Sequence, residues 1–226
     1  MQLSVKPTSA TLRTGIVDIL RQAIMTGQLK PGEHLKEVEV AEQLSVSRSP
    51  VREAFRQLEQ ENLIVSIPNQ GSFVRIFGEQ DVREIFALRA ALEDLACKIV
   101  LEQKKLGPDE FRELERYIER QREAIRAGDA QGLSALDMDF HEYLCRKSGY
   151  ERLLRMWQGL RAQIHVLFYH RFRRLNTVSQ TVDTDHSAIL SALRRGSLHE
   201  FSQISHEINS RVAGECIEVM RSLTLS

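Results

Sequence analysis

Residues 47–56 read SRSPVREAFR, and two stripes of side chains run through this stretch. At 100° per residue the stripes fall on different faces of one helix. They are a basic stripe of Arg48, Arg52 and Arg56 and an apolar stripe of Val51, Phe55 and Leu58. Ser47 or Ser49 can cap this helix, and Pro50 suits its first turn because a proline there gives up no helical hydrogen bond. The apolar stripe needs a core, and the basic stripe needs a negatively charged partner.

The elements around this helix predict a winged helix-turn-helix domain over residues 1–77. Apolar spacing predicts a first helix from Leu12 that stops at Gly27, and a second, short helix over 35–44. A tight connection at 45–47 leads into the arginine-bearing helix, which runs to about Glu61. LIVSIP (63–68) and SFVRIF (72–77) then predict two strands around an Asn-Gln-Gly turn.

From Glu79 onward the strand signals disappear. Six helices are predicted, at roughly 80–103, 108–127, 130–148, 150–174, 181–195 and 197–222, and glycines mark four of the five connections between them. Residues 78–226 therefore predict an all-helical antiparallel bundle. The fold class expected for the chain is mostly α, with an N-terminal winged helix-turn-helix and a C-terminal helical domain.

Composition limits the classes of protein. The 226 residues are 42% hydrophobic with a formal net charge of +0, and the first 77 hold nine Lys/Arg and eight Asp/Glu, a net of +1. Binding to DNA must therefore come from local patterning of charge. Three separated cysteines predict free, buried thiols in a reducing compartment. With no stretch resembling a signal peptide and no apolar run of 18 residues, we expect a cytoplasmic protein without a membrane partner.

The basic stripe is a candidate DNA contact. A helix that enters the major groove needs long side chains near its N-terminus, and the forked guanidinium of arginine reaches both phosphates and guanine edges. The alternative is a solvated face paired with Glu53 and Glu59, but the position after a tight turn and before a wing favours DNA. The candidate contacts are Ser47, Arg48, Ser49, Arg52 and Arg56, together with Asn69, Gln70 and Gly71, which otherwise form an ordinary hairpin turn.

Four side chains that can ligate a metal are expected on interior faces of the second domain. Asp137 and His141 are four residues apart, His186 lies within an apolar stripe, and His206 shares a face with apolar residues of the last helix. The alternative is that each is a core residue with its own hydrogen-bond partner. One aspartate and three histidines suit a divalent ion, with Zn²⁺ first and Ni²⁺ or Mn²⁺ as the others.

Arg89 falls within another apolar stripe. A buried arginine needs an anion. Glu93, four residues further on, is the structural partner, and a bound carboxylate ligand is the functional alternative.

Several of these stretches resemble one family. TGQLKPGEHLKEVEVAEQLSVSRSPVREAFRQLEQENLIVSIPNQGSFV (26–74) resembles the DNA-binding signature of the GntR family of bacterial transcription regulators. LRAALEDLA (88–96), DMDFHEYL (137–144) and DHSAILSALRRGSLHEF (185–201) resemble the FCD effector domain of its FadR-like branch. Two departures stand out, because the usual glycine of the turn is Ser45 here, and a position that is basic in some fatty-acyl regulators is Val38.

The resemblance implies a homodimeric, ligand-responsive regulator that binds palindromic operator DNA through Arg48 and Arg52. It also implies a metal held by the Asp137 and His141 pair with the two later histidines, and a small organic acid that completes the coordination through its carboxylate. One alternative is a metal sensor in which the ion itself is the signal. Another is a metallohydrolase fused to a DNA-binding module, but the sequence offers no clear general base for it, because Glu142 points away from the face of His141.

Overall fold

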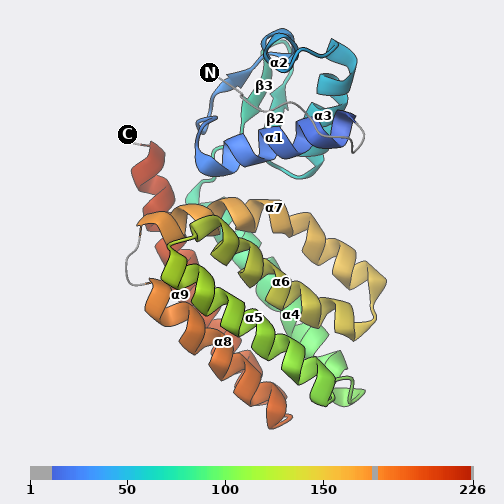
Figure 1. Ribbon diagram of the computed structural model, residues 1–226, viewed down its shortest axis with the longest axis vertical. Helices are drawn as coiled ribbons and strands as arrows, with labels where there is room; N and C mark the ends of the chain where they lie inside the picture. Colours follow the sequence, from blue (N-terminus) through green and yellow to red (C-terminus); the bar gives the residue numbers. More distant parts are fainter. Residues whose placement is uncertain (1–11, 175–177, 225–226) are drawn as a thin grey trace. The chain divides into compact units, whose positions relative to one another are not determined.

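The computed structural model describes residues 12–174 and 178–224, and it divides the chain into two compact units between Phe77 and Gly78. The described residues form nine helices and one small sheet, which lies in the first unit (Figure 1). The predicted fold class, a winged helix-turn-helix followed by a helical domain, is confirmed.

The first unit contains three helices and three strands. They are α1 (Leu12–Thr26), β1 (His34–Leu35), α2 (Glu37–Leu44), α3 (Arg48–Gln60), β2 (Ile64–Ile67) and β3 (Gly71–Val74). The sheet is antiparallel in the order β1-β3-β2. Leu35, predicted at the start of the second helix, instead pairs in β1, and Val38 is exposed. A single buried leucine fits a strand and a helix equally well, so burial could not decide between them.

The two stripes of α3 take opposite environments. Val51, Phe55 and Leu58 are buried, and α3 packs against α1, α2 and β2. The arginines of the other stripe remain exposed. Burial of the apolar stripe therefore sets the rotation of α3 about its axis, and this rotation directs the arginine stripe toward the surface.

Among the turn positions of this unit that have a positive φ, Ser45 and Gly71 bear directly on the sequence pattern. Ser45 ends α2 with φ 55° and ψ 44°, a conformation that glycine adopts at lower cost than serine. The departure from glycine is thus tolerated without changing the turn. Gly71, at the tip of the wing, has φ 107°, and a Cβ there would lie 2.5 Å from Nε2 of His34. Only glycine fits at this position.

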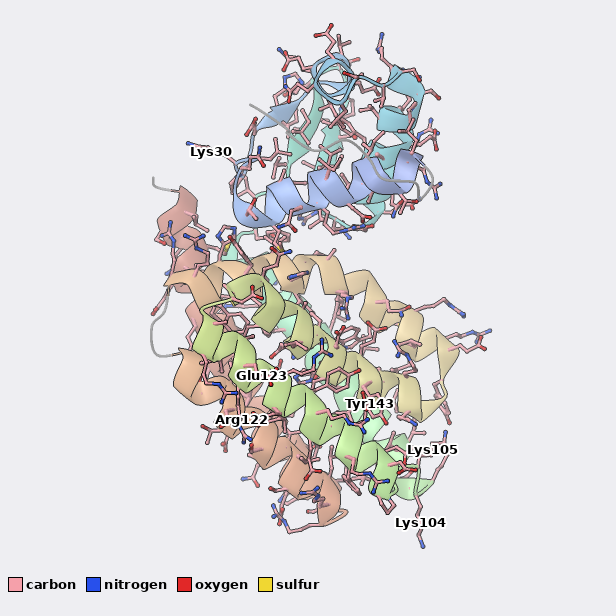
Figure 2. The ribbon with its side chains drawn as sticks, in the orientation of Figure 1. Lys30, Lys104, Lys105, Arg122, Glu123 and Tyr143 are labelled. Carbon is pink, nitrogen blue, oxygen red and sulfur yellow. The ribbon has the colours of Figure 1, made fainter. Side chains whose placement is uncertain are left out.

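The second unit consists of six helices whose bounds agree with the predicted ranges to within about three residues. They are α4 (Glu79–Glu102), α5 (Pro108–Ala127), α6 (Ala130–Ser148), α7 (Glu151–Arg174), α8 (Val178–Arg194) and α9 (Leu198–Thr224). Helix α6 packs against α4, α5 and α7, while α9 packs against α4, α7 and α8 (Figure 1). Arg122 on α5, labelled in Figure 2, forms an ion pair of 2.8 Å with Asp183 on α8.

Apolar side chains from most of these helices form the core of the bundle. One cluster of this core includes Leu114, Ile118, Phe140, Leu144, Ile189, Leu193 and Phe201. The three cysteines are free and buried, as predicted. Within the described residues, no helix is long and apolar enough to cross a bilayer.

Candidate functional sites

The arginine stripe of α3 lies on the surface of the first unit. The side chains of Arg48, Arg52 and Arg56 are 59%, 52% and 65% exposed. Glu37, at the start of α2, accepts from Nε of Arg52 at 3.1 Å and lies 3.5 Å from Nη2 of Arg48. The hydrogen bond from Arg52 lowers the pKa of Glu37. Exposed ion pairs of this kind contribute only about 0–1 kcal/mol, so a phosphate or a base edge can displace the carboxylate.

The carboxylate partners differ in part from the expected ones. Arg56 pairs with Glu53 at 2.9 Å, but Glu59 accepts from the backbone N–H of Ser66 in the wing. The other candidate DNA contacts are also exposed, namely Ser47, Ser49, Asn69, Gln70 and Gly71. All eight predicted positions therefore belong to one unit and lie on its surface, seven of them at the start of α3 and at the tip of the wing and Arg56 further along α3.

In the second unit, Asp137, His141 and His186 come together in the interior. The ligand atoms of this group all lie within 4.8 Å of one another. Nε2 of His141 is 3.1 Å from Nε2 of His186, and Oδ1 of Asp137 is 3.3 Å from Nε2 of His186. Two nitrogens each about 2.1 Å from one ion lie about 3.0–3.4 Å apart at coordination angles of about 90–109°. The spacing of the two imidazoles therefore fits two ligands of a single ion.

Outer partners orient both imidazoles. Nδ1 of His141 lies 2.9 Å from Oε2 of Glu93, and Nδ1 of His186 lies 2.7 Å from Oε1 of Gln121. Because an ionised carboxylate and an amide oxygen only accept hydrogen bonds, each Nδ1 carries the proton and donates it. Each Nε2 then turns a lone pair toward the other, which is the tautomer that a metal ligand needs.

Arg89 and Trp157 complete the network around Glu93. Arg89 donates from Nε to Oε1 of Glu93 at 2.9 Å and from Nη2 to Oδ2 of Asp137 at 3.3 Å. Trp157 donates from Nε1 to Oε1 of Glu93 at 3.1 Å. Of the two roles considered for Arg89, the structure shows the pairing with Glu93, and a second carboxylate shares the same guanidinium.

The ionisation states follow from these contacts. Burial raises the pKa of Glu93, but the charge of Arg89 and the hydrogen bonds from His141 and Trp157 outweigh burial and lower the pKa to about 2. Burial also opposes ionisation of Asp137, yet the charge of Arg89 holds its pKa well below the usual range. Burial lowers the pKa of His141 further than Glu93 raises it. Near neutral pH the group therefore combines ionised carboxylates with a neutral His141.

His206 does not join this group. It is exposed on α9 and lies against a separate hollow of about 190 Å³ that Arg83 and Ala90 also line. The inward face of α9 instead carries Ser205 and Asn209, which are both buried. His206 follows Ser205 by one residue and is thus turned by about 100° from it. In the sequence, His206 shares a helical face with apolar residues of α9. That shared face does not point toward the cavity beside Asp137, His141 and His186.

A cavity of about 20 Å³ lies beside the buried group, lined by residues of α4, α6, α7, α8 and α9. Asp137, His141 and His186 belong to its lining, and so do Arg89 and Arg171. This volume holds about one water-sized sphere. Phe86 and Asn209 line both the cavity and the hollow beside His206, so they form the wall between them.

Sequence reasoning missed Gln121, Asn209 and Arg171. Gln121 is fully buried and follows Leu114 and Ile118 on the same face of α5, so a polar residue at a core position was the available signal. Arg171 follows Leu167 and Phe168 at helical spacing on α7, so a charged residue at a core position was the available signal there too. Asn209 lies between Ile208 and Ser210 and gave no comparable signal.

A winged helix-turn-helix with an exposed arginine stripe, together with a helical domain, is the arrangement of a DNA-binding regulator. The similarity of the chain to known protein families agrees with this class. The chain belongs to the GntR family of bacterial regulatory proteins, whose model matches residues 12–74, and residues 84–210 match the FCD domain. It is therefore a transcriptional regulator and not an enzyme, and the metallohydrolase alternative is set aside.

Named relatives show the same class. The chain is 32% identical over 177 residues to the Bacillus subtilis protein "Uncharacterized HTH-type transcriptional regulator YdhC", covering 76% of this chain and 77% of that one. It is 31% identical over 157 residues to a Paenarthrobacter nicotinovorans protein named "Probable D-xylose utilization operon transcriptional repressor", covering 70% and 68%. The solved structure of Escherichia coli McbR/YncC has 25% identity and a TM-score of 0.73, covering 89% and 95%.

Proposed function

We propose that the chain is a homodimeric regulator of operator DNA whose helical domain holds one divalent ion and binds a small carboxylate effector. Asp137, His141 and His186 would hold the ion. The observation that carries the proposal is the 3.1 Å approach of two imidazole Nε2 atoms whose Nδ1 atoms both face acceptors. When bound, Zn²⁺, Ni²⁺ or Mn²⁺ supplies a positive charge and open coordination positions for an anionic oxygen.

The charge of the group supports a cation and a carboxylate together. Arg89 contributes +1 and Glu93 and Asp137 contribute −1 each, which leaves −1 in the interior. A divalent ion changes this to +1, and a single carboxylate then brings it to zero. Buried charge is costly unless it is compensated, so the ion and one carboxylate form a balanced set.

The size of the cavity supports a conformational response. A space of about 20 Å³ accepts an ion or a water, whereas even a small organic acid needs more room. Effector binding therefore requires the helices that line the cavity to move apart. A ligand that binds an opened form better than a closed form shifts the population between them, which is what a ligand-responsive regulator needs.

The same small volume keeps one alternative open, a regulator for which the ion itself is the signal. A titration of operator affinity distinguishes the two functions. With an effector, adding organic acid to the metal-loaded protein changes operator affinity. With a metal sensor, adding and chelating the ion changes operator affinity and the organic acid adds nothing.

Proton competition gives a first test of the ion site. Burial holds the pKa of His141 below its ordinary value of 6.5, so the imidazole is neutral at pH 7 and accepts the ion without losing a proton. Zinc affinity measured by calorimetry should be nearly constant between pH 7.5 and 6.5 and should fall at a lower pH, where protons compete with the ion for the imidazoles. An affinity that shows no loss on acidification down to the pH at which the protein unfolds would show that these imidazoles do not bind the ion.

A dimer is expected because one winged helix contacts too few base pairs for useful specificity. Two copies related by a two-fold axis read the two halves of a palindrome. We expect the helical domain to supply most of the interface. Analytical ultracentrifugation at micromolar concentration should show a dimer with and without DNA, and a monomer under both conditions contradicts this part of the proposal.

A further inference from the structure

Arg171 on α7 lines the cavity beside the buried group and carries an unpaired donor atom, Nη2. Its side chain is only 2% exposed and lines the same cavity as Asp137 and His186. Its Nε donates to Oε2 of Glu215 at 2.6 Å. Its Nη2 is also buried, and it has no hydrogen-bond partner among the residues that the structure describes.

The packing holds this guanidinium in place. Its Cζ lies 5.7 Å from the ring centroid of Phe168 and 5.3 Å from that of Phe172, within the range of cation–π contacts. Native proteins rarely leave a buried donor unpaired, because it loses its hydration and gains nothing in return. A donor that is fixed by packing and unpaired in a cavity is therefore suited to an acceptor that arrives from outside.

Arg89 is not equivalent to Arg171. The guanidinium of Arg89 already donates to Glu93 and to Asp137. An effector carboxylate at Arg89 would compete with two buried carboxylates that also orient the imidazoles. Arg171 can accept such a ligand without breaking its own ion pair with Glu215.

The charges near Arg171 set the charge of the ligand. Arg171 is balanced by Glu215, and Asp185, which also lines the cavity, is balanced by Arg211. The uncompensated charge is then that of the ion-binding group, +1 when a divalent ion is bound. A singly charged anion balances it.

We infer that Nη2 of Arg171 donates a hydrogen bond to the carboxylate of the effector, and that the site selects a small monocarboxylate anion over a neutral molecule of the same shape. This inference rests on the proposed function. It transfers the anion-binding role from Arg89 to Arg171.

Acetate and acetamide make the test direct, because they match in size and differ in charge. Calorimetry on zinc-loaded protein should show binding of acetate and none of acetamide. Arg171→Gln should weaken acetate binding about tenfold or more, the usual effect of losing a charged hydrogen bond, with zinc stoichiometry unchanged. Arg173→Gln is the matched control, since Arg173 is exposed two residues further along α7, and its acetate affinity should equal that of the wild type.

A second variant works in the opposite direction. Glu215→Gln removes the anion that pairs with Arg171, so acetate should bind more tightly. If Arg171→Gln does not fold, Glu215→Gln alone decides, and weaker or unchanged binding overturns the inference. Wild-type protein that binds no acetate, or Arg171→Gln protein that binds it equally well, also overturns it.

Failure of the ion site gives a different result. If the wild type takes up no zinc, the metal part of the proposed function fails. The same acetate titrations on metal-free protein then still compare wild type with Arg171→Gln. Loss of acetate binding only in that variant would uphold the role of Arg171 without the ion.

Discussion

Arg52→Ala is expected to weaken binding to a specific operator by about 1–3 kcal/mol if the guanidinium contacts a base edge. The side chain is half exposed in the first turns of α3, and its partner in the free protein is the carboxylate of Glu37 at 3.1 Å. That exposed pair is easily exchanged for DNA. The variant loses the contact and also leaves Glu37 less neutralised close to the expected path of the DNA backbone.

The measurement uses an operator selected from random duplex DNA by the wild-type protein, titrated at several salt concentrations. A contact to phosphate alone would lower affinity for all sequences and reduce the salt slope by about one. Arg116→Ala is a suitable control, because Arg116 is an exposed arginine of α5 whose loss removes the same charge from the helical unit. Unchanged affinity and unchanged salt dependence in both Arg48→Ala and Arg52→Ala would falsify the assignment of α3 as the DNA-contacting helix.

His186→Ala is expected to abolish metal binding and the response to effector together, while effector-independent DNA binding survives. His186 offers one of three ligand atoms in the group. Loss of an outer partner of a ligand already costs about 10–100-fold in metal affinity, so loss of the ligand itself should cost more. DNA binding is retained because the arginine stripe belongs to the other compact unit.

Two further histidine variants sharpen this test. His199→Ala removes an exposed histidine of α9, and His206→Ala removes the one that the sequence placed in the site but the structure places outside it. Both should keep full zinc stoichiometry. Thermal unfolding of His186→Ala distinguishes loss of a ligand from loss of the fold, since this side chain also packs 4.4 Å from the ring centroid of Phe140. Effector binding of equal strength with and without metal would show that the ion has no part in effector recognition.

The fold could be predicted because its signals are local. Helices α4 to α9 carry apolar repeats, glycine-containing connections follow α4, α5, α6 and α8, and the wing has a turn that requires Gly71. The position of Leu35 could not be predicted, because β1 exists only through its pairing with β3. The two strands are some forty residues apart in the sequence, and a strand of two residues is too short to show an alternating pattern of apolar side chains.

The candidate site could be predicted only in part. Asp137 and His141 share a face at a spacing of four, and His186 is surrounded by apolar residues, so their inward orientation follows from the pattern. The placement of His206 depended on which side of α9 faces the cavity, and α9 carries apolar residues on more than one side. The partnership of Gln121 with His186 and the open donor of Arg171 arise from contacts between helices that no spacing encodes.

The metal content of protein purified without chelator tests most directly whether the buried group is an ion site. We expect one divalent ion per chain, removed by chelation and restored by Zn²⁺, Ni²⁺ or Mn²⁺, with the spectrum of Co²⁺-substituted protein showing nitrogen and oxygen ligands. Metal-free protein that takes up none of these ions, while Asp137, His141 and His186 are intact and folded, would contradict the account.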